Sequence, residues 1–357
     1  MYSSLSIKNF RGIESLQLED TRRINLIVGR NNAGKSTVLE SLFLLGSAAN
    51  TAAALSIALL RDPEASKADR LWRTFFHNAD PGTPIEVEGQ WNDQPRRLKI
   101  SAIKAEPGSA SADPKVPSAA RVATISDSFT IGGLALVLSN GDGVQSEGTI
   151  KIPPGSHNMA STSGSNGPDT GILPTTLVSA RGWTSMPDIA RQFSDLAKIK
   201  QEDSVVEALR SIDTRISRLD VLSDGGSAAV YADIGLDSLL PLSAAGEGLM
   251  RLLIMAVAFA GIRGGVLLVD EIDNGLHHSV MDKLWTFLDQ QCERFNVQMF
   301  ATTHSDEMLR SALRSLSGES KRPGLFRIDV RNGRHVATSY DAEAIAGVLE
   351  SNFEVRS

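Results

Sequence analysis

The sequence lacks several features that would point to a secreted or membrane protein. A single cysteine, Cys292, stands among the 357 residues, which excludes an internal disulfide and a cysteine-ligated metal cluster. One free cysteine fits a reducing cytoplasm. The N-terminal residues lack the long apolar core of a signal peptide. The longest apolar run, around 252–261, is too short to span a bilayer. We therefore expect a cytoplasmic protein with no membrane partner.

The chain also lacks net positive charge. Its formal charge is -6 at pH 7, with a pI near 5.6. This argues against a protein whose whole surface binds nucleic acid, although a local basic groove is compatible with it. Hydrophobic residues make up 41% of the chain, which is enough for the core of one large α/β domain or two smaller ones.

What the sequence does contain is a phosphate-binding pattern. Residues 29–37 read G-x-x-x-x-G-K-[ST], between a short apolar strand and a mostly apolar helix. Backbone N–H groups of such a loop, with the helix N-terminus, bind phosphates. In this pattern Lys35 reaches the β- and γ-phosphates, and Ser36 places its hydroxyl on Mg²⁺. An ordinary strand–turn–helix with a chance glycine pattern is the alternative.

Two further apolar strands end in residues suited to phosphate chemistry. Residues 266–269 lead into Asp270, placed to hold Mg²⁺, and Glu271, placed to deprotonate the attacking water. Residues 298–302 lead to His304, at the position of a γ-phosphate sensor. The alternatives are an acidic turn and a structural histidine.

A second anion-binding loop precedes the most apolar helix. Residues 242–248 read Leu-Ser-Ala-Ala-Gly-Glu-Gly, and the free N–H groups that follow can bind an anion. Nothing else in the chain requires a second anion site, so the loop makes sense if it caps a nucleotide held by another protomer. The simpler interpretation is that Ser243 caps the helix.

Hydrophobic periodicity predicts the remaining elements. The predicted strands are 5–10, 15–18, 85–91, 97–103, 122–125, 134–138, 149–152, 175–179 and a final hairpin, 325–330 with 335–340. The predicted helices are 51–60, 187–222, one after His304, and 341–349. Two polar segments, 106–119 and 153–171, are expected to be mobile loops. We divide this single domain into N-terminal strands, P-loop and helix (1–84), an antiparallel β region (85–180), a helical subdomain (185–222) and a C-terminal part (230–357).

Together these motifs resemble the ATP-binding-cassette (ABC) ATPases, on the branch containing SMC, RecF and OLD-family proteins. Residues 7–13, Ile-Lys-Asn-Phe-Arg-Gly-Ile, resemble that branch's opening strand, and Asn274-Gly275-Leu276-His277 is most similar to the OLD-like members. The resemblance implies an α/β P-loop NTPase fold. It would be an ABC-type ATPase head with a central, mostly parallel sheet, an inserted antiparallel β region and a helical subdomain.

The resemblance also implies a role for each motif. The nucleotide would be bound by Gly29, Arg30, Asn31, Asn32, Ala33, Gly34, Lys35, Ser36 and Thr37, with Arg11 near the adenine. Catalysis would use Glu271, Lys35 and His304, and Mg²⁺ would be held by Ser36 and Asp270. Ser243, Gly246 and Glu247 would form a signature loop that reaches a partner's ATP, and Asn274 and Gly275 would form the D-loop.

Three features depart from the family pattern. The signature is not Leu-Ser-Gly-Gly-Gln, so its register can shift by one residue. His277 stands where transporter ATPases have an aspartate. No glutamine is assigned to the Q-loop, for which Gln90 and Gln192 are the candidates.

Residues 305–357 are too few for the TOPRIM nuclease domain of full-length OLD proteins, since a domain needs on the order of 100 residues.

These observations predict a dimeric switch that binds and hydrolyses ATP and scaffolds or gates a separate effector. By resemblance the effector is a nuclease, in phage defence or DNA maintenance. The alternative is a RecF-like repair ATPase that binds DNA through a basic surface. Candidate residues for that surface are Arg22, Arg23, Arg70, Arg73, Arg96 and Arg97. The altered signature disfavours a transporter subunit, and the absence of an apolar strand before Ser66-Lys67-Ala68-Asp69 disfavours a GTPase.

Overall fold

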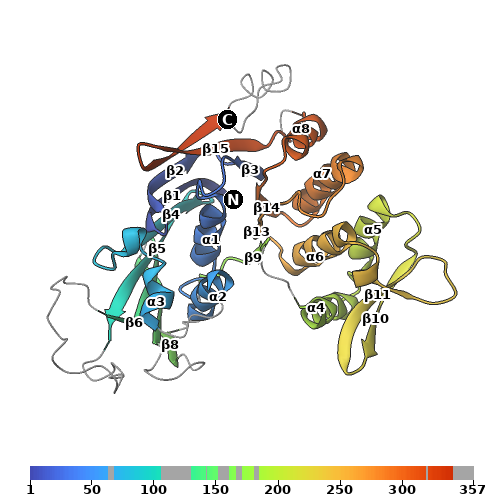
Figure 1. The fold of residues 1–357 in the computed structure, drawn as a ribbon, viewed down its shortest axis with the longest axis horizontal. Coiled ribbons are helices and arrows are strands. Elements are labelled where there is room, and N and C mark those ends of the chain that lie inside the picture. The colour runs from blue at the N-terminus through green and yellow to red at the C-terminus, as the bar shows by residue number, and fades with distance from the viewer. Residues whose placement is uncertain are drawn as a thin grey trace, which may run out of the picture.

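The computed structural model describes residues 1–62, 68–105, 130–141, 143–151, 161–165, 171–180, 185–318 and 321–340. Figure 1 shows the first long helix, α1 (Lys35–Gly46), between an antiparallel sheet and a mostly parallel sheet. A second group of helices covers the other face of the parallel sheet (Figure 1). The predicted strands 122–125 and helix 341–349, and the predicted loop 106–119, lie outside the described residues.

Six strands form the mostly parallel sheet, in the order β16-β15-β3-β14-β13-β9. They are β3 (Ile24–Val28), β9 (Thr175–Val178), β13 (Val266–Val269), β14 (Gln298–Thr302), β15 (Gly324–Arg331) and β16 (Arg334–Tyr340). Within this sheet β16 alone pairs antiparallel. Because parallel strands share one carboxyl edge, the segments that follow β3, β13 and β14 meet there.

The parallel strands are buried on both faces. Within β13, Val266 and Leu268 belong to the core on the α1 side, whereas Leu267 and Val269 belong to the core under the other helices. This is the alternation of a strand between two layers. The sheet therefore fixes α1 and the loop before it relative to the helices on the far side.

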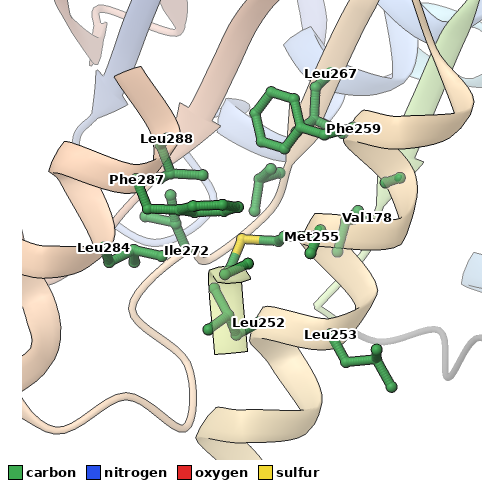
Figure 2. Packing of buried hydrophobic residues seen from close by; sticks show 14 of the residues in the cluster. Val178, Leu252, Leu253, Met255, Phe259, Leu267, Ile272, Leu284, Phe287 and Leu288 are labelled. Atoms are coloured by element: carbon green, nitrogen blue, oxygen red, sulfur yellow. The ribbon is translucent and has the colours of Figure 1, made fainter. Parts of the chain in front are cut away.

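Those far-side helices carry the second core. They are α4 (Met186–Lys198), α5 (Asp203–Ile212), α6 (Glu247–Gly261), α7 (His278–Arg294) and α8 (Asp306–Ser315). Figure 2 shows Met255 and Phe259 of α6 beside Leu267 of the sheet and Phe287 of α7. The Phe259 and Phe287 rings meet edge to face, 6.4 Å between centroids. The α6 helix is buried almost all round, as its apolar sequence requires.

The antiparallel β region is larger than expected, because it includes both N-terminal strands. Its order is β2-β1-β4-β5-β6-β7-β8. The strands are β1 (Tyr2–Phe10), β2 (Ile13–Glu19), β4 (Ile85–Trp91), β5 (Gln94–Lys104), β6 (Ile131–Asn140), β7 (Gly143–Lys151) and β8 (Ser161–Ser165). The prediction of a loop throughout 153–171 is therefore wrong at 161–165, which pair with β7.

The stretch 187–222, which was predicted to be helical throughout, instead contains two helices and a strand. After α4 and α5 the chain forms an antiparallel sheet of β10 (Arg218–Asp224), β11 (Ser227–Asp233) and β12 (Leu240–Pro241). The hairpin projects beyond the helices (Figure 1). Apolar side chains at 219 and 221 alternate with polar ones, so a strand buries them on one face where a helix would not.

The predicted helix at 51–60 is confirmed as α2 (Thr51–Arg61), which is followed by α3 (Ala68–Arg73) and a short 3₁₀ turn, η1 (His77–Ala79). The predicted C-terminal hairpin is confirmed as β15 and β16, turning at Asn332 and Gly333. Both central turn residues have positive φ, which is the geometry that Asn-Gly favours.

Candidate active site

The phosphate-binding loop joins β3 to α1. Gly29 has φ 139°, and a Cβ there would lie 2.2 Å from the carbonyl oxygen of Ile328, so only glycine fits. The Lys35 side chain is buried, and its Nζ donates to the carbonyl oxygens of Gly29 and Arg30 at 2.8 and 2.9 Å. The loop is therefore closed around its own lysine.

The next residue connects the loop to the acidic strand. Ser36 donates through Oγ to Oδ1 of Asp270 at 3.0 Å, and Asp270 is 9% exposed. The hydroxyl of Thr302 donates to the same Oδ1 at 2.7 Å and accepts the backbone N–H of Glu271 at 2.8 Å. We call Ser36 and Asp270 the metal corner. No sequence motif predicted a role for Thr302, whose hydroxyl holds both acidic residues in place.

An open cleft of about 530 Å³ lies at the carboxyl edge of the sheet. Its lining residues are Gly29, Arg30, Asn31, Glu271, Asp273, Asn274 and His304. Glu271 is half-buried and has φ 49°, an uncommon conformation for a non-glycine residue. The structure thus brings together the phosphate loop, Glu271, His304 and one of the two D-loop residues.

A second aspartate supports the histidine segment. Oδ1 of Asp273 accepts the Thr303 hydroxyl at 2.6 Å and the backbone N–H of His304 at 3.4 Å. Asp273 lies on the turn after Glu271, so Glu271 and His304 are positioned through one hydrogen-bonded unit. The sequence analysis assigned no role to Asp273.

Arg251 of α6 donates hydrogen bonds to the backbone just beyond the ends of β9 and β13. It donates through its guanidinium to the carbonyl oxygens of Asp270, of Glu271 at 3.3 Å and of Ser179 at 3.2 Å. Burial lowers the pKa of Arg251, and nearby carboxylates, Asp270 foremost, oppose that shift. Because it binds backbone and not side chains, the residue has no motif signal, and sequence reasoning missed it.

The proposed signature loop lies apart from the cleft. Ser243 is in a short 3₁₀ turn, η3 (Leu242–Ala244), and Gly246 precedes α6 with φ 112°. No side chain caps α6, so the alternative in which Ser243 is its cap is wrong. Ser243, Gly246 and Glu247 are exposed, and among the described residues they are not part of the cleft lining.

The D-loop packs directly against the start of α6. A Cβ on Gly248 would lie 2.7 Å from the carbonyl oxygen of Gly275, and a Cβ on Gly275 would lie 3.0 Å from Cγ of Glu247. The two glycines therefore allow the signature loop and the D-loop of one protomer to touch.

Arg11 lies on the turn between β1 and β2, and its side chain is engaged with α1. Its Nε lies 2.6 Å from Oε2 of Glu40, and its guanidinium stacks near the rings of Phe10 and Phe75. Burial lowers the pKa of Arg11, whereas the Glu40 charge raises it. Glu40 also pairs with Arg61 at 2.8 Å.

Four of the six arginines expected to form a basic surface already have partners within the protein. Arg96 is 7% exposed and donates to carbonyl oxygens at the end of α1, so its assignment to a surface is wrong. Three others are paired with carboxylates: Arg70 with Asp62, Arg73 with Asp69, and Arg97 with Glu88.

The metal corner fits Mg²⁺ better than a transition metal. Its donors are a hydroxyl and a carboxylate, the oxygen ligands that Mg²⁺ prefers alongside water and substrate phosphates. Within the described part of the chain, no group of three or more His, Cys, Asp or Glu residues could hold a metal ion. A hydroxyl and one carboxylate would leave the other positions around such an ion to water and substrate phosphates.

Comparison with known proteins identifies the family. Residues 24–310 match the family model described as "AAA domain, putative AbiEii toxin, Type IV TA system". The chain belongs to this family. Within this AAA-domain protein the match runs from β3 into α8, so it contains the phosphate loop, the acidic strand and His304.

Several known proteins are similar to this AAA-domain protein. A Helicobacter pylori (strain ATCC 700392 / 26695) protein named ATP/GTP phosphatase is 26% identical over 331 residues, covering 87% of this chain and 86% of that protein. The DNA replication and repair protein RecF of Actinobacillus pleuropneumoniae serotype 5b (strain L20) is 50% identical over 44 residues, 12% of each chain. The match to RecF is thus confined to a short part of the chain, whereas the match to the Helicobacter protein covers most of it.

The fold has a solved counterpart. A crystal structure of an SMC head bound to the C-winged helix domain of ScpA has a TM-score of 0.51 and 14% identity, covering 97% of this chain and 99% of that chain. The predicted ABC-type α/β head is thereby confirmed as a fold. No helix among the described residues of this AAA-domain protein is long and apolar enough to cross a bilayer.

Proposed function

We propose that this protein binds ATP with Mg²⁺ and hydrolyses it to ADP and phosphate. The observation that carries the proposal is the cleft lined by residues from three separate strand ends: 29–31, then Glu271, Asp273 and Asn274, then His304. Phosphoryl transfer needs a phosphate cradle and a base for water in one space, with a metal site beside them. The similarity to a protein named ATP/GTP phosphatase supports the same activity.

Each residue has a defined task in this proposal. Lys35 leaves the loop carbonyls for the β- and γ-phosphates, while Ser36 and Asp270 hold Mg²⁺. When bound, Mg²⁺ neutralises charge that develops on the phosphate oxygens. Glu271 takes the proton of the attacking water, and His304 contacts the γ-phosphate. The adenine lies near the turn that contains Arg11. The guanidinium of Arg11 is paired with the carboxylate of Glu40.

Three variants test the activity. Glu271→Gln should bind ATP normally but hydrolyse it about 100-fold more slowly or worse, because a general base contributes that much. Lys35→Ala should lose nucleotide binding. Glu293→Gln, an exposed glutamate of α7, is the control and should hydrolyse ATP like the unchanged protein. Hydrolysis by Glu271→Gln at the unchanged rate would contradict the assigned base.

The exposed signature loop supports a dimeric switch. Ser243, Gly246 and Glu247 lie outside their own cleft, where a second copy could present them to the nucleotide. ATP would then be sandwiched between two copies, and hydrolysis would open them. Light scattering on Glu271→Gln should show a doubled mass with ATP and Mg²⁺, and Ser243→Arg should prevent it. An unchanged mass in ATP would count against the sandwich.

A dimer of this kind would scaffold or gate a separate effector, and the OLD-like motif 274–277 suggests a nuclease in phage defence or DNA maintenance. Co-purification of a nuclease with the ATP-bound dimer would support this role. The alternative is a RecF-like repair ATPase, favoured by the RecF match. Duplex DNA affinity that falls with salt would support the alternative, although Arg96 is buried and three candidate arginines are already paired.

A further inference from the structure

Basic residues precede four neighbouring strands of the mostly parallel sheet. Arg22 and Arg23 come directly before β3, while Arg263, Arg294 and Lys321 come shortly before β13, β14 and β15. These strands are neighbours in the order β15-β3-β14-β13 and run parallel. Their starts therefore share one edge of the sheet, which we call the amino edge, opposite the edge that carries the nucleotide cleft.

Backbone hydrogen bonds hold the strand starts side by side. The N–H of Met299 donates to the carbonyl oxygen of Arg23 at 2.7 Å. The N–H of Gly264 donates to the carbonyl oxygen of Phe295 at 3.0 Å. Because neighbouring strands lie about 4.8 Å apart, the four starts span about 15 Å. The sheet thus sets the spacing of the basic residues.

Phe295 holds two of the guanidinium groups at one place. The Cζ atoms of Arg263 and Arg294 lie 5.5 and 5.4 Å from the centroid of its ring. The ring is buried, whereas both arginines are exposed. A cation is attracted to the face of an aromatic ring, so the two side chains are ordered before any ligand arrives.

Three of the arginines have no acidic partner. Arg22, Arg23 and Arg263 are exposed, and none of them makes an ion pair with a carboxylate in the part of the chain that the structure describes. Asp20 lies on the same turn as Arg22 and is also exposed, but the two are not paired. These guanidinium groups are therefore available to an anion from outside the chain.

The other two cations of the amino edge have partners. Nε-type donors are not shared evenly: Lys321 binds Asp289 at 2.7 Å, and this hydrogen bond raises the pKa of Lys321, whereas the nearby charge of Arg23 opposes the rise. Arg294 lies 3.9 Å from Glu207, and both side chains are more than half exposed. Exposed pairs of this kind contribute little, so Arg294 can exchange its partner for another anion.

We propose that the amino edge is a nucleic-acid-binding surface, whose guanidinium groups contact phosphates of the phosphodiester backbone. A guanidinium can bind one phosphate with two parallel N–H donors. Cations spaced by the strands of a sheet suit a polymer with regularly spaced charges, which nucleic acid provides. Since the nucleotide cleft lies at the opposite edge, the inference goes beyond the proposed ATP hydrolysis and does not depend on it. Of the six arginines suggested by the sequence, only Arg22 and Arg23 belong to this surface.

The test measures fluorescence anisotropy of labelled duplex DNA, single-stranded DNA and RNA over a range of salt concentrations. These three probes share the phosphodiester backbone, and their relative affinities identify the preferred form. The double variant Arg23→Gln, Arg263→Gln should lower the slope of log K against log salt by about 2, since each lost phosphate contact removes about 1. The double variant Arg70→Gln, Arg97→Gln loses the same charge from exposed positions elsewhere, and should keep the slope.

A second double variant guards against a folding defect. Arg23→Lys, Arg263→Lys keeps both charges and should retain most of the slope. Equal slopes for the two glutamine double variants, or no binding of any probe by the unchanged protein at low salt, would overturn the inference. Binding of labelled polyglutamate but of no nucleic acid would also overturn it, and would indicate an acidic protein partner instead. Hydrolysis of ATP, measured on the same samples, tests the proposed function separately.

Discussion

The hydroxyl of Ser36 lies 3.0 Å from Oδ1 of Asp270, although 234 positions separate the two residues in the chain. One belongs to the phosphate loop and the other ends the acidic strand. β3 and β13 are separated by β14, whose Thr302 donates to the same carboxylate oxygen. The metal corner therefore depends on the strand order of the sheet.

A double-mutant cycle on Ser36→Ala and Asp270→Asn should reveal that the two residues hold one ion. Each single change should weaken ATP–Mg²⁺ binding, and the double change should cost less than the sum by about 1 kcal/mol or more. Calorimetric titration with ATP and Mg²⁺ measures the cycle. Additive losses would show that the two residues act separately.

Thr302→Val should remove the hydroxyl that connects Asp270 with Glu271 while keeping the shape of the side chain. The change removes the hydroxyl of the fully buried Thr302 and leaves the backbone N–H of the half-buried Glu271 without its 2.8 Å partner, which costs about 1–3 kcal/mol of stability. Hydrolysis should slow more than ATP binding weakens, because Glu271 loses its anchor. Thr302→Ser, which keeps the hydroxyl, should retain the hydrolysis rate, and a slow Thr302→Ser protein would implicate the lost methyl group instead.

Arg251→Ala should destabilise the fold and slow hydrolysis without touching the cleft. Three carbonyl oxygens lose a charged donor, which predicts a loss of about 2–3 kcal/mol in urea unfolding. The surface arginine Arg314, paired with Asp282, is the control, and its removal should cost less than about 1 kcal/mol. Equal losses for the two variants would contradict the assigned role.

Glu40→Gln should be among the most destabilising single changes on α1. It leaves Arg11 charged and mostly buried without its counter-ion, and breaking a buried pair typically costs about 3–5 kcal/mol. The exposed pair of Glu88 and Arg97 gives a control, since Glu88→Gln should change stability by less than about 1 kcal/mol. Thermal unfolding of both variants measures the two losses of stability and tests whether they differ as expected.

His335 should make stability depend on pH below neutrality. Burial, and then the charge of His77, lower the pKa of His335, whose ring lies against Gly34 of the phosphate loop. The unfolded chain then binds the proton more readily, so this contribution is complete above about pH 6.5 and declines as pH falls toward the lower folded-state pKa. Urea midpoints from pH 7.5 to pH 5 should fall less for His335→Gln than for the unchanged protein. The exposed His278→Gln should follow the unchanged curve.

The sequence predicted the site wherever chemistry is encoded in consecutive residues. The phosphate loop, Asp270, Glu271 and His304 were found because a strand followed by a specific residue type is a local signal. Thr302 and Arg251 were not, because they act through a shared carboxylate and through backbone carbonyls.

The errors in the predicted fold have a similar cause. β1 and β4 pair across some eighty residues, so the N-terminal strands join the antiparallel region by contacts that no local pattern records. At 218–224 the apolar residues fit either a helix or a strand, and pairing with β11 decides the outcome. Local propensity yields to such long-range contacts.

The close approach of Gly248 to the Gly275 carbonyl has a consequence for timing in a dimer. Because one protomer's signature loop and D-loop touch, a movement of either at its own nucleotide shifts the edge offered to the other copy's nucleotide. In the proposed ATP-sandwich dimer, two sites joined in this way would not hydrolyse ATP independently. ATP turnover should rise sigmoidally with concentration, and Gly248→Ala, which pushes the two loops apart, should make it hyperbolic.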